Sequence, residues 1–236
     1  RSRAELLRRR IEALPPGGRD LLGALAVAGG SGVPRGMLAE MVGNAALEQD
    51  TAVLKKSGLV VERRPGAFAG EREIALRISG IRDIVQASLD PDRLRALHRA
   101  AGDWLARWPG SPIPGLAAHI AWHYAAGGMD IEAADHHLAA AQEALRSCAN
   151  RDAWDHYRAA AELLVVTPDS RTWDERTTNA SVVWPNLAQA WLGVAEIGAH
   201  IGELQAALAA AESVLARTGD GDVPFRCRAL CVRADI

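Results

Sequence analysis

The stretch GLVVERRPGAFAGEREIALRISGIRDIVQASLDPDRLRALH, residues 58–98, decides which fold is expected for this chain. Its first half contains two short runs, 59–63 and 73–78, which flank a loop rich in glycine and proline. In the second run every other residue is isoleucine or leucine, which is the period of a β-strand. The two runs and their loop therefore predict a β-hairpin.

Helices are expected on both sides of this hairpin. After it, Asp90-Pro91 separates helices predicted at 80–89 and 91–107, because proline has no amide hydrogen to donate inside a helix. Before it, apolar residues recur at helical spacing in four segments: one ending at Leu14, one ending at Ala28, one from Pro34 to Val42 and one over 45–57. Helices followed by a hairpin in this order are typical of a winged-helix domain, in which 45–57 would be the recognition helix.

The remainder of the chain predicts a separate helical domain. Residues 108–114, WPGSPIP, form the clearest linker in the sequence. After them the sequence is rich in alanine and forms amphipathic helical segments that pair up. We therefore expect a mainly α fold with two domains: a winged-helix domain with a small β-hairpin and trailing helices at 1–110, and an α-helical solenoid at 115–236.

The composition is that of an ordinary globular protein. Of the 236 residues, 49% are hydrophobic, 24% are charged and only 5% are aromatic, so alanine and leucine must provide most of the packing. No apolar run approaches the ~18 residues of a membrane span, and no signal peptide opens the chain. The sequence starts at Arg1 and ends inside an apparent helix at Ile236, so we expect a piece of a longer, cytoplasmic protein.

The three cysteines do not make a disulfide framework. Cys148 stands alone, whereas Cys227 and Cys231 are four residues apart and would share one face of a helix. Such a pair could bind a metal, but two small buried hydrophobic residues are the more ordinary reading. Cysteine usage thus favours a reducing compartment.

The last third of the chain resembles a tetratricopeptide repeat. With Gly202 as the turn glycine, Trp191 takes the position of the large residue of the first helix. Ala195 and Ala207 then take the positions of the small residues of the two helices. The apolar face of the second helix is expected to consist of Leu204, Leu208, Ala211 and Leu215. A second, similar unit is centred on Gly128, and the resemblance implies stacked hairpins with a continuous core.

Four short motifs follow one another in an informative order: Ile11-Glu12-Ala13-Leu14-Pro15-Pro16, Gly58-Leu59-Val60, Ile81-Arg82-Asp83 and Arg95-Ala96-Leu97-His98-Arg99. With them, the chain resembles the region that follows the ATPase module in bacterial STAND-type signalling ATPases. Those proteins often carry a Ser/Thr kinase, a nucleotide cyclase or a LuxR-type DNA-binding domain at their other end. The resemblance implies a regulatory segment whose winged helix couples to a nucleotide-binding module that this chain lacks.

No nucleotide site is expected in this chain itself. The phosphate-binding pattern Gly-x-x-x-x-Gly-Lys-Ser/Thr does not occur, and the only lysines are Lys55 and Lys56. Relatives often place a histidine just before the Ile-Arg-Asp helix, and here that position is Ile78 or Ser79. We therefore expect no cofactor.

No catalytic centre can be assembled from the sequence motifs. His119 and His123 have the i, i+4 spacing that can chelate a divalent metal on a helix, with His136 or His137 as further ligands. Ile120, however, occupies the place of the glutamate that metalloproteases require. We expect helix-surface histidines, no metal site and no enzymatic activity in this chain alone.

DNA binding by the winged helix is the alternative function. Residues 1–110 carry 18 Lys and Arg against 13 Asp and Glu, whereas residues 111–236 carry 9 against 16. Most of the basic surplus lies in the first helix, and in 45–57 two acidic residues cancel two lysines. Contacts to DNA phosphates need unopposed cations on the groove-facing element, so nucleic acid is not the expected partner.

A protein or peptide partner is expected on the helical array. Four aromatic side chains are candidates for this contact: Trp122, Trp154, Tyr157 and Trp191. Large residues at these spacings more often fill the space between hairpins, so a core role is the alternative. The expected function is that of a regulatory, protein-binding segment of a larger signal-transduction protein.

Overall fold

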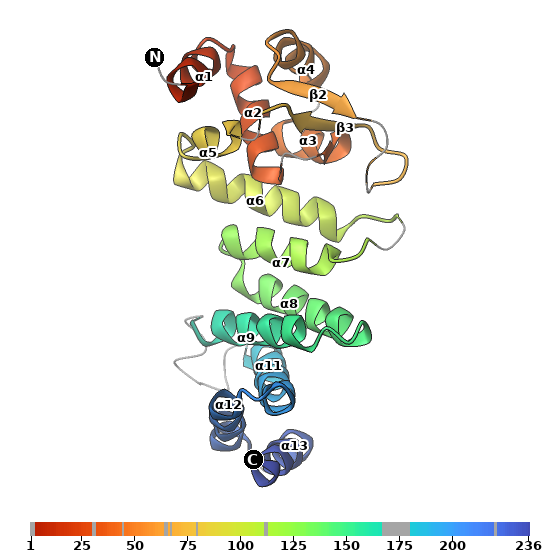
Figure 1. Cartoon of the computed structure of the whole chain (residues 1–236), viewed down its shortest axis with the longest axis vertical. Helices are drawn as coiled ribbons and strands as arrows, with labels where there is room; N and C mark the ends of the chain where they lie inside the picture. The colour runs from red at the N-terminus through yellow and green to blue at the C-terminus, as the bar shows by residue number, and fades with distance from the viewer. Residues whose placement is uncertain are drawn as a thin grey trace. The chain divides into compact units, whose positions relative to one another are not determined.

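The computed structural model describes residues 3–29, 32–43, 45–63, 66, 68–78, 80–110, 113–166, 180–219 and 221–236 (Figure 1). It is 74% helix, with twelve helices in these ranges and a small three-stranded antiparallel sheet. The predicted mainly α fold is confirmed at this level. The chain packs into two compact units, Arg1–Pro114 with Ala126–Gly128, and Gly115–Ala125 with Met129–Ile236.

The N-terminal unit is built around one helix whose residues from Leu21 onward are all apolar. This helix, α2 (Pro16–Ala28), buries every residue from Leu21 to Ala28, and it begins with proline in its first turn and ends at Gly29 with φ +117. A helical segment that is apolar on all sides needs neighbours on all sides. It is surrounded by α3 (Arg35–Val42), α4 (Leu47–Lys56), α5 (Ile81–Gln86) and α6 (Pro91–Ala106). Another helix, α1 (Arg3–Glu12), packs against α5.

The sheet of this unit has the strand order β1-β3-β2. The predicted hairpin is confirmed: β2 (Val60–Arg63) pairs antiparallel with β3 (Glu73–Leu76), from Val60↔Leu76 to Arg63↔Glu73. A third strand, β1 (Val33–Pro34), lies on the other side of β3 and was not expected from the sequence.

Pro34 therefore has a different place from the predicted one. It was expected in the first turn of a helix, but it pairs with Glu73 in β1 and caps α3, which begins at Arg35. An edge strand such as β1 tolerates proline, because no hydrogen bond of the sheet depends on the amide hydrogen that proline lacks.

The C-terminal unit contains successive antiparallel helices. They are α7 (Leu116–Ala126), α8 (Asp130–Arg146), α9 (Asn150–Val166), α11 (Ala180–Ile201), α12 (Leu204–Arg217) and α13 (Val223–Asp235). From α8 onward each of these helices packs on the next one, and α11 also contacts α8 and α13. Gly202 joins α11 to α12 with φ +88, a left-handed conformation that glycine adopts without strain.

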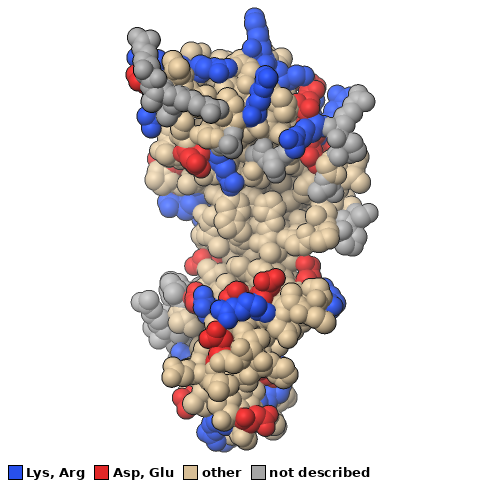
Figure 2. Space-filling model, in the orientation of Figure 1, with Lys and Arg blue, Asp and Glu red and all other residues tan. Residues whose placement is uncertain are grey.

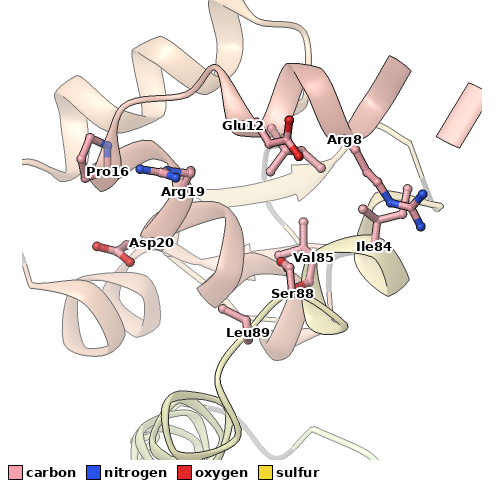
Figure 3. Close-up of a pocket in the computed structure, with 10 residues that line it drawn as sticks. Arg8, Glu12, Pro16, Arg19, Asp20, Ile84, Val85, Ser88 and Leu89 are labelled. Atoms are coloured by element: carbon pink, nitrogen blue, oxygen red, sulfur yellow. The ribbon is translucent and has the colours of Figure 1, made fainter. Parts of the chain in front are cut away.

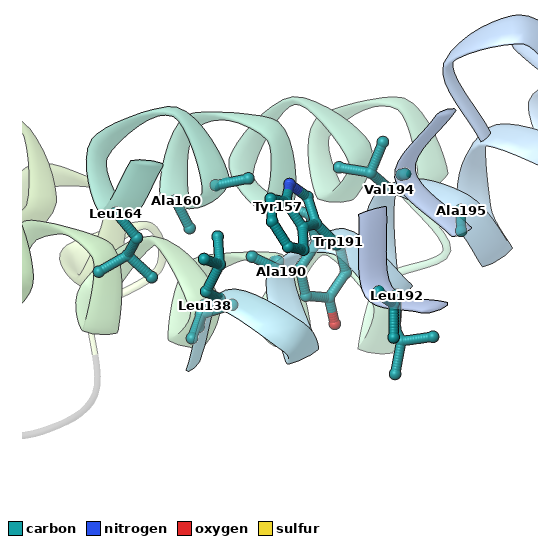
Figure 4. Packing of buried hydrophobic residues seen from close by; sticks show 14 of the residues in the cluster. Leu138, Tyr157, Ala160, Leu164, Ala190, Trp191, Leu192, Val194 and Ala195 are labelled. Atoms are coloured by element: carbon teal, nitrogen blue, oxygen red, sulfur yellow. The ribbon is translucent and has the colours of Figure 1, made fainter. Parts of the chain in front are cut away.

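The core of this unit contains large aromatic residues between alanine-rich helices (Figure 4). Tyr157 and Leu164 of α9 pack with Ala190 and Trp191 of α11 in one buried cluster. Small residues let helix backbones approach closely, and the aromatic rings fill the remaining space. The buried face of α12 agrees with the predicted one in part: Ala207 and Ala211 are buried as expected and Leu215 packs against the core. Ala210 and Val214 are buried as well, whereas Leu204 is 48% exposed.

Candidate functional site

Three of the four candidate partner-binding aromatics belong to the core of the C-terminal unit. Trp154, Tyr157 and Trp191 are 3%, 7% and 9% exposed and lie in one cluster. The core role that was weighed against partner contact is thus confirmed for these three. Trp122 on α7 is different, because 42% of it is exposed. Its ring stacks against His119, with centroids 6.1 Å apart.

Arginine guanidinium groups lie over the rings of two of these indoles. The guanidinium of Arg151 lies 4.7 Å from the Trp154 ring and that of Arg158 lies 5.0 Å from it. Arg217 lies 4.8 Å from the Trp191 ring. A cation over an aromatic face is stabilising and shields the ring from water. The rings of Trp154 and Trp191 are therefore shielded from solvent by arginine side chains.

An open groove lies beside Trp191. It has a volume of about 440 Å³ and runs between α9 and α12, with α11 as its floor. The walls are small or apolar: Ala161 and Val165 on α9, Ala206, Ala209 and Ala210 on α12, and Trp191 and Val194 on α11. We call this surface the α9–α12 groove. It can accept apolar side chains, because little polar surface would have to be desolvated.

The α9–α12 groove was not found from the sequence. The alanines at 206, 209 and 210 do have the helical spacing of a stripe, but alanine at that spacing is equally typical of a buried interface. Only the packing shows that Ala209 is exposed while Ala210 is buried. The signal was present in the sequence, but its meaning depended on which helix covers which face.

The two histidines considered as metal ligands lie on α7. The ring centroids of His119 and His123 are 4.9 Å apart, and His123 is fully buried. It was expected on the helix surface, but it is buried, and its ring centroid lies 4.6 Å from that of the Trp122 ring. Within the described ranges, no group of three or more His, Cys, Asp or Glu side chains could hold a metal ion.

Burial lowers the pKa of three other histidines. The pKa of His98 falls from 6.5 to about 4, through burial and then through the positive charge of Arg82. Burial, His156 and His136 lower the pKa of His137 to about 4 as well, and burial lowers that of His136. The Nδ1 atoms of His137 and His156 are 3.1 Å apart, so one ring must donate and the other accept. Near pH 7, His98, His136 and His137 are therefore neutral packing groups.

The cysteine prediction was wrong. Cys227 and Cys231 were interpreted as buried hydrophobic residues, but both are exposed on α13, and Cys148 is exposed as well. The residues of α13 that are buried are Ala229 and Val232, on a different face of the helix. Sequence spacing alone identified the shared face of the two cysteines but not the direction in which it points.

Two basic residues on the surface that would contact DNA in a winged helix form ion pairs. Lys55 of α4 forms an ion pair with Glu62 of β2 at 3.0 Å, and Arg35 of α3 pairs with Glu48 of α4. On the face drawn in Figure 2, basic side chains predominate over the N-terminal unit, with some acidic side chains among them. Paired charges release few counterions from a DNA backbone, which weakens the case for direct binding.

The loop between β2 and β3 is anchored to α6. Phe68 is 8% exposed and makes edge contacts with Trp104 and Trp108, at centroid distances of 5.5 and 5.2 Å. Glu71 accepts a hydrogen bond at 3.3 Å from the backbone N–H of Gly36 at the start of α3. These contacts hold Phe68 and Glu71 against the rest of the N-terminal unit.

No protein-family model matches the sequence, and no curated protein or solved structure matches it either. Among the helices in the described part of the chain, none has the length and apolar character needed to cross a membrane.

Proposed function

We propose that this chain is a regulatory and protein-binding segment of a larger multidomain signal-transduction ATPase. In this proposal the N-terminal unit is a winged-helix domain that couples to a nucleotide-binding module. The C-terminal unit is a tetratricopeptide-like array that binds a protein partner. The order of the four sequence motifs supports the first assignment. The antiparallel helices with a left-handed glycine at Gly202 support the second.

The observation that carries the proposal is the α9–α12 groove. Its alanine walls leave space above Trp191 and Val194, and its rim carries Arg158 and Glu162, which pair with each other at 3.3 Å. An apolar floor with a charged rim is the arrangement of many peptide-binding surfaces. The expected occupant is a peptide of a protein partner that inserts apolar side chains.

The four aromatic residues contribute to this function in different ways. Trp191 lines the groove directly, while Trp154 and Tyr157 hold α9 against α11 and so set the width of the groove. Trp122 is exposed on α7 and does not line the groove. Its partner contact remains a separate prediction.

Peptide display on the immobilised 236-residue chain tests the proposal. Peptides selected on the native chain should share apolar anchor positions and should fail to bind Ala209→Arg, which places a long charged side chain in the groove. Ala216→Arg is the matched control, because Ala216 is also exposed on α12 but does not line the groove. Selected peptides that bind both variants equally well would remove the groove from the proposal.

A further inference from the structure

A second hollow lies in the N-terminal unit, between α1, α2 and α5 (Figure 3). Its volume is about 440 Å³, within the range of pockets that take small molecules. Val85 and Leu89, from α5 and the turn that follows it, form an apolar floor, and Val85 is only 3% exposed. We call this hollow the α1–α5 pocket.

Four charged side chains also line the pocket. Arg8 and Glu12 come from α1, and Arg19 and Asp20 come from α2 (Figure 3). Each wall of the pocket therefore offers one guanidinium and one carboxylate. A ligand on the floor would meet both signs of charge.

These four groups make no ion pair with any described residue. The comparison within α1 is informative, because Glu5 and Arg9 are four residues apart and pair at 3.4 Å. Arg8 and Glu12 have the same separation on the same helix but do not pair. Their hydrogen-bonding capacity is thus available at the pocket.

We propose that the α1–α5 pocket binds a small zwitterion that carries an apolar group, of the size of an apolar amino acid or a dipeptide. The carboxylate of the ligand contacts a guanidinium, Arg8 or Arg19. Its ammonium contacts a carboxylate, Glu12 or Asp20. The apolar side chain lies on Val85 and Leu89. This site is independent of the α9–α12 groove.

The physical basis is that neither half of such a ligand would bind well alone. Hydrogen bonds between oppositely charged groups are stronger than neutral ones, but exposed charges gain little from a single contact. An apolar side chain on a floor of two aliphatic residues also gains only a modest amount. A molecule that joins both kinds of group in one frame combines these contributions.

Isothermal titration of the 236-residue chain with L-leucine and with L-leucyl-L-leucine tests the proposal. At least one of the two should bind, and the better ligand shows whether a free amino acid or a dipeptide is preferred. N-acetyl-leucyl-leucine amide has the same apolar groups without either charge and should not bind. Equal binding of the capped compound would overturn the proposal, and so would the absence of heat with both zwitterions at millimolar concentration.

Single substitutions at the pocket locate the site. Arg19→Gln and Asp20→Asn should each weaken binding about tenfold, which corresponds to the loss of one charge-assisted hydrogen bond. Arg93→Gln and Asp152→Asn are matched controls, since both residues are exposed and neither lines the pocket. All four changes are at the surface, and thermal melts without ligand check that each variant folds. Binding that the pocket variants leave unchanged would contradict the assignment.

Discussion

The ring of Tyr157 on α9 lies directly on the backbone of Gly193 on α11. A Cβ atom built on Gly193 would be 2.3 Å from Cγ of that ring, a distance at which one of the two helices has to move. The neighbouring pair is similar, because a Cβ on Gly198 would lie 3.0 Å from the indole nitrogen of Trp154. The absence of two side chains on α11 thus creates the room for the two largest residues of α9.

Gly193→Ala should destabilise the C-terminal unit. Alanine favours a helix over glycine, but overpacking of a core costs about 1–3 kcal/mol and should exceed that gain. Urea unfolding followed by circular dichroism measures the difference. Gly219→Ala is the control, because a Cβ there meets nothing within 4 Å. A Gly193→Ala variant as stable as the native chain would show that α9 and α11 are not tightly packed.

Trp154→Ala and Trp122→Ala should have very different effects. Removal of the buried Trp154 leaves a cavity and strips Arg151 and Arg158 of their aromatic partner, at a cost of about 3–5 kcal/mol. Trp122 is 42% exposed, so its replacement should change the free energy of unfolding by roughly 0.5 kcal/mol or less. Chemical denaturation of both variants makes the comparison, and similar losses would contradict this packing.

The N-terminal unit should lose stability as the pH falls through the range set by His98. In the unfolded chain this histidine takes up a proton near pH 6.5, whereas in the folded chain it does so only at about 4. The unfolded state therefore binds more protons between these values. The resulting stability difference is fully present above pH 6.5 and is lost on acidification, by about 3 kcal/mol at pH 4. His98→Gln should flatten this slope, and an unchanged slope would exclude His98 as its source.

All three cysteines should react in the native state. Cys148, Cys227 and Cys231 are exposed, so a thiol reagent such as Ellman's reagent should titrate three thiols without denaturant. Buried cysteines would react only after unfolding. The count of reactive thiols before and after addition of guanidinium separates the two cases.

The chain should not retard duplex DNA at physiological salt. Lys55 and Arg35 are already paired with Glu62 and Glu48, so few phosphate contacts are available. A mobility shift assay on random duplex at 50 and 200 mM salt provides the measurement. A shift that is strong at low salt and disappears at high salt would instead favour the alternative function, a DNA-binding regulator.

Helices and strands with a strongly periodic sequence were predictable, but which face of a helix is buried was not. The hairpin and the helices on either side of it were expected close to their observed bounds, because alternation and proline placement are local signals. The two-residue strand β1 was missed, since pairing of Val33 with Ile74 depends on a contact far along the chain. On α12 the prediction was right for Ala207 and Ala211 but wrong for Leu204, which is exposed, because close helix packing favours small residues there.

The candidate site shows the same limit. Spacing correctly marked Trp191 as a large interior residue, but the α9–α12 groove arises from the distance between two helices that are not consecutive in the array. The α1–α5 pocket likewise combines Arg8 with Asp20 and Leu89, which no sequence motif connects. Sites of this kind follow from tertiary packing.

The contact of Phe68 with Trp104 and Trp108 can be monitored by intrinsic tryptophan fluorescence. Any partner that lifts the β2–β3 loop away from α6 has to expose two indoles to water, and their emission should then shift to longer wavelength. Engagement of the N-terminal unit by another module can thus be followed in solution without attaching a label.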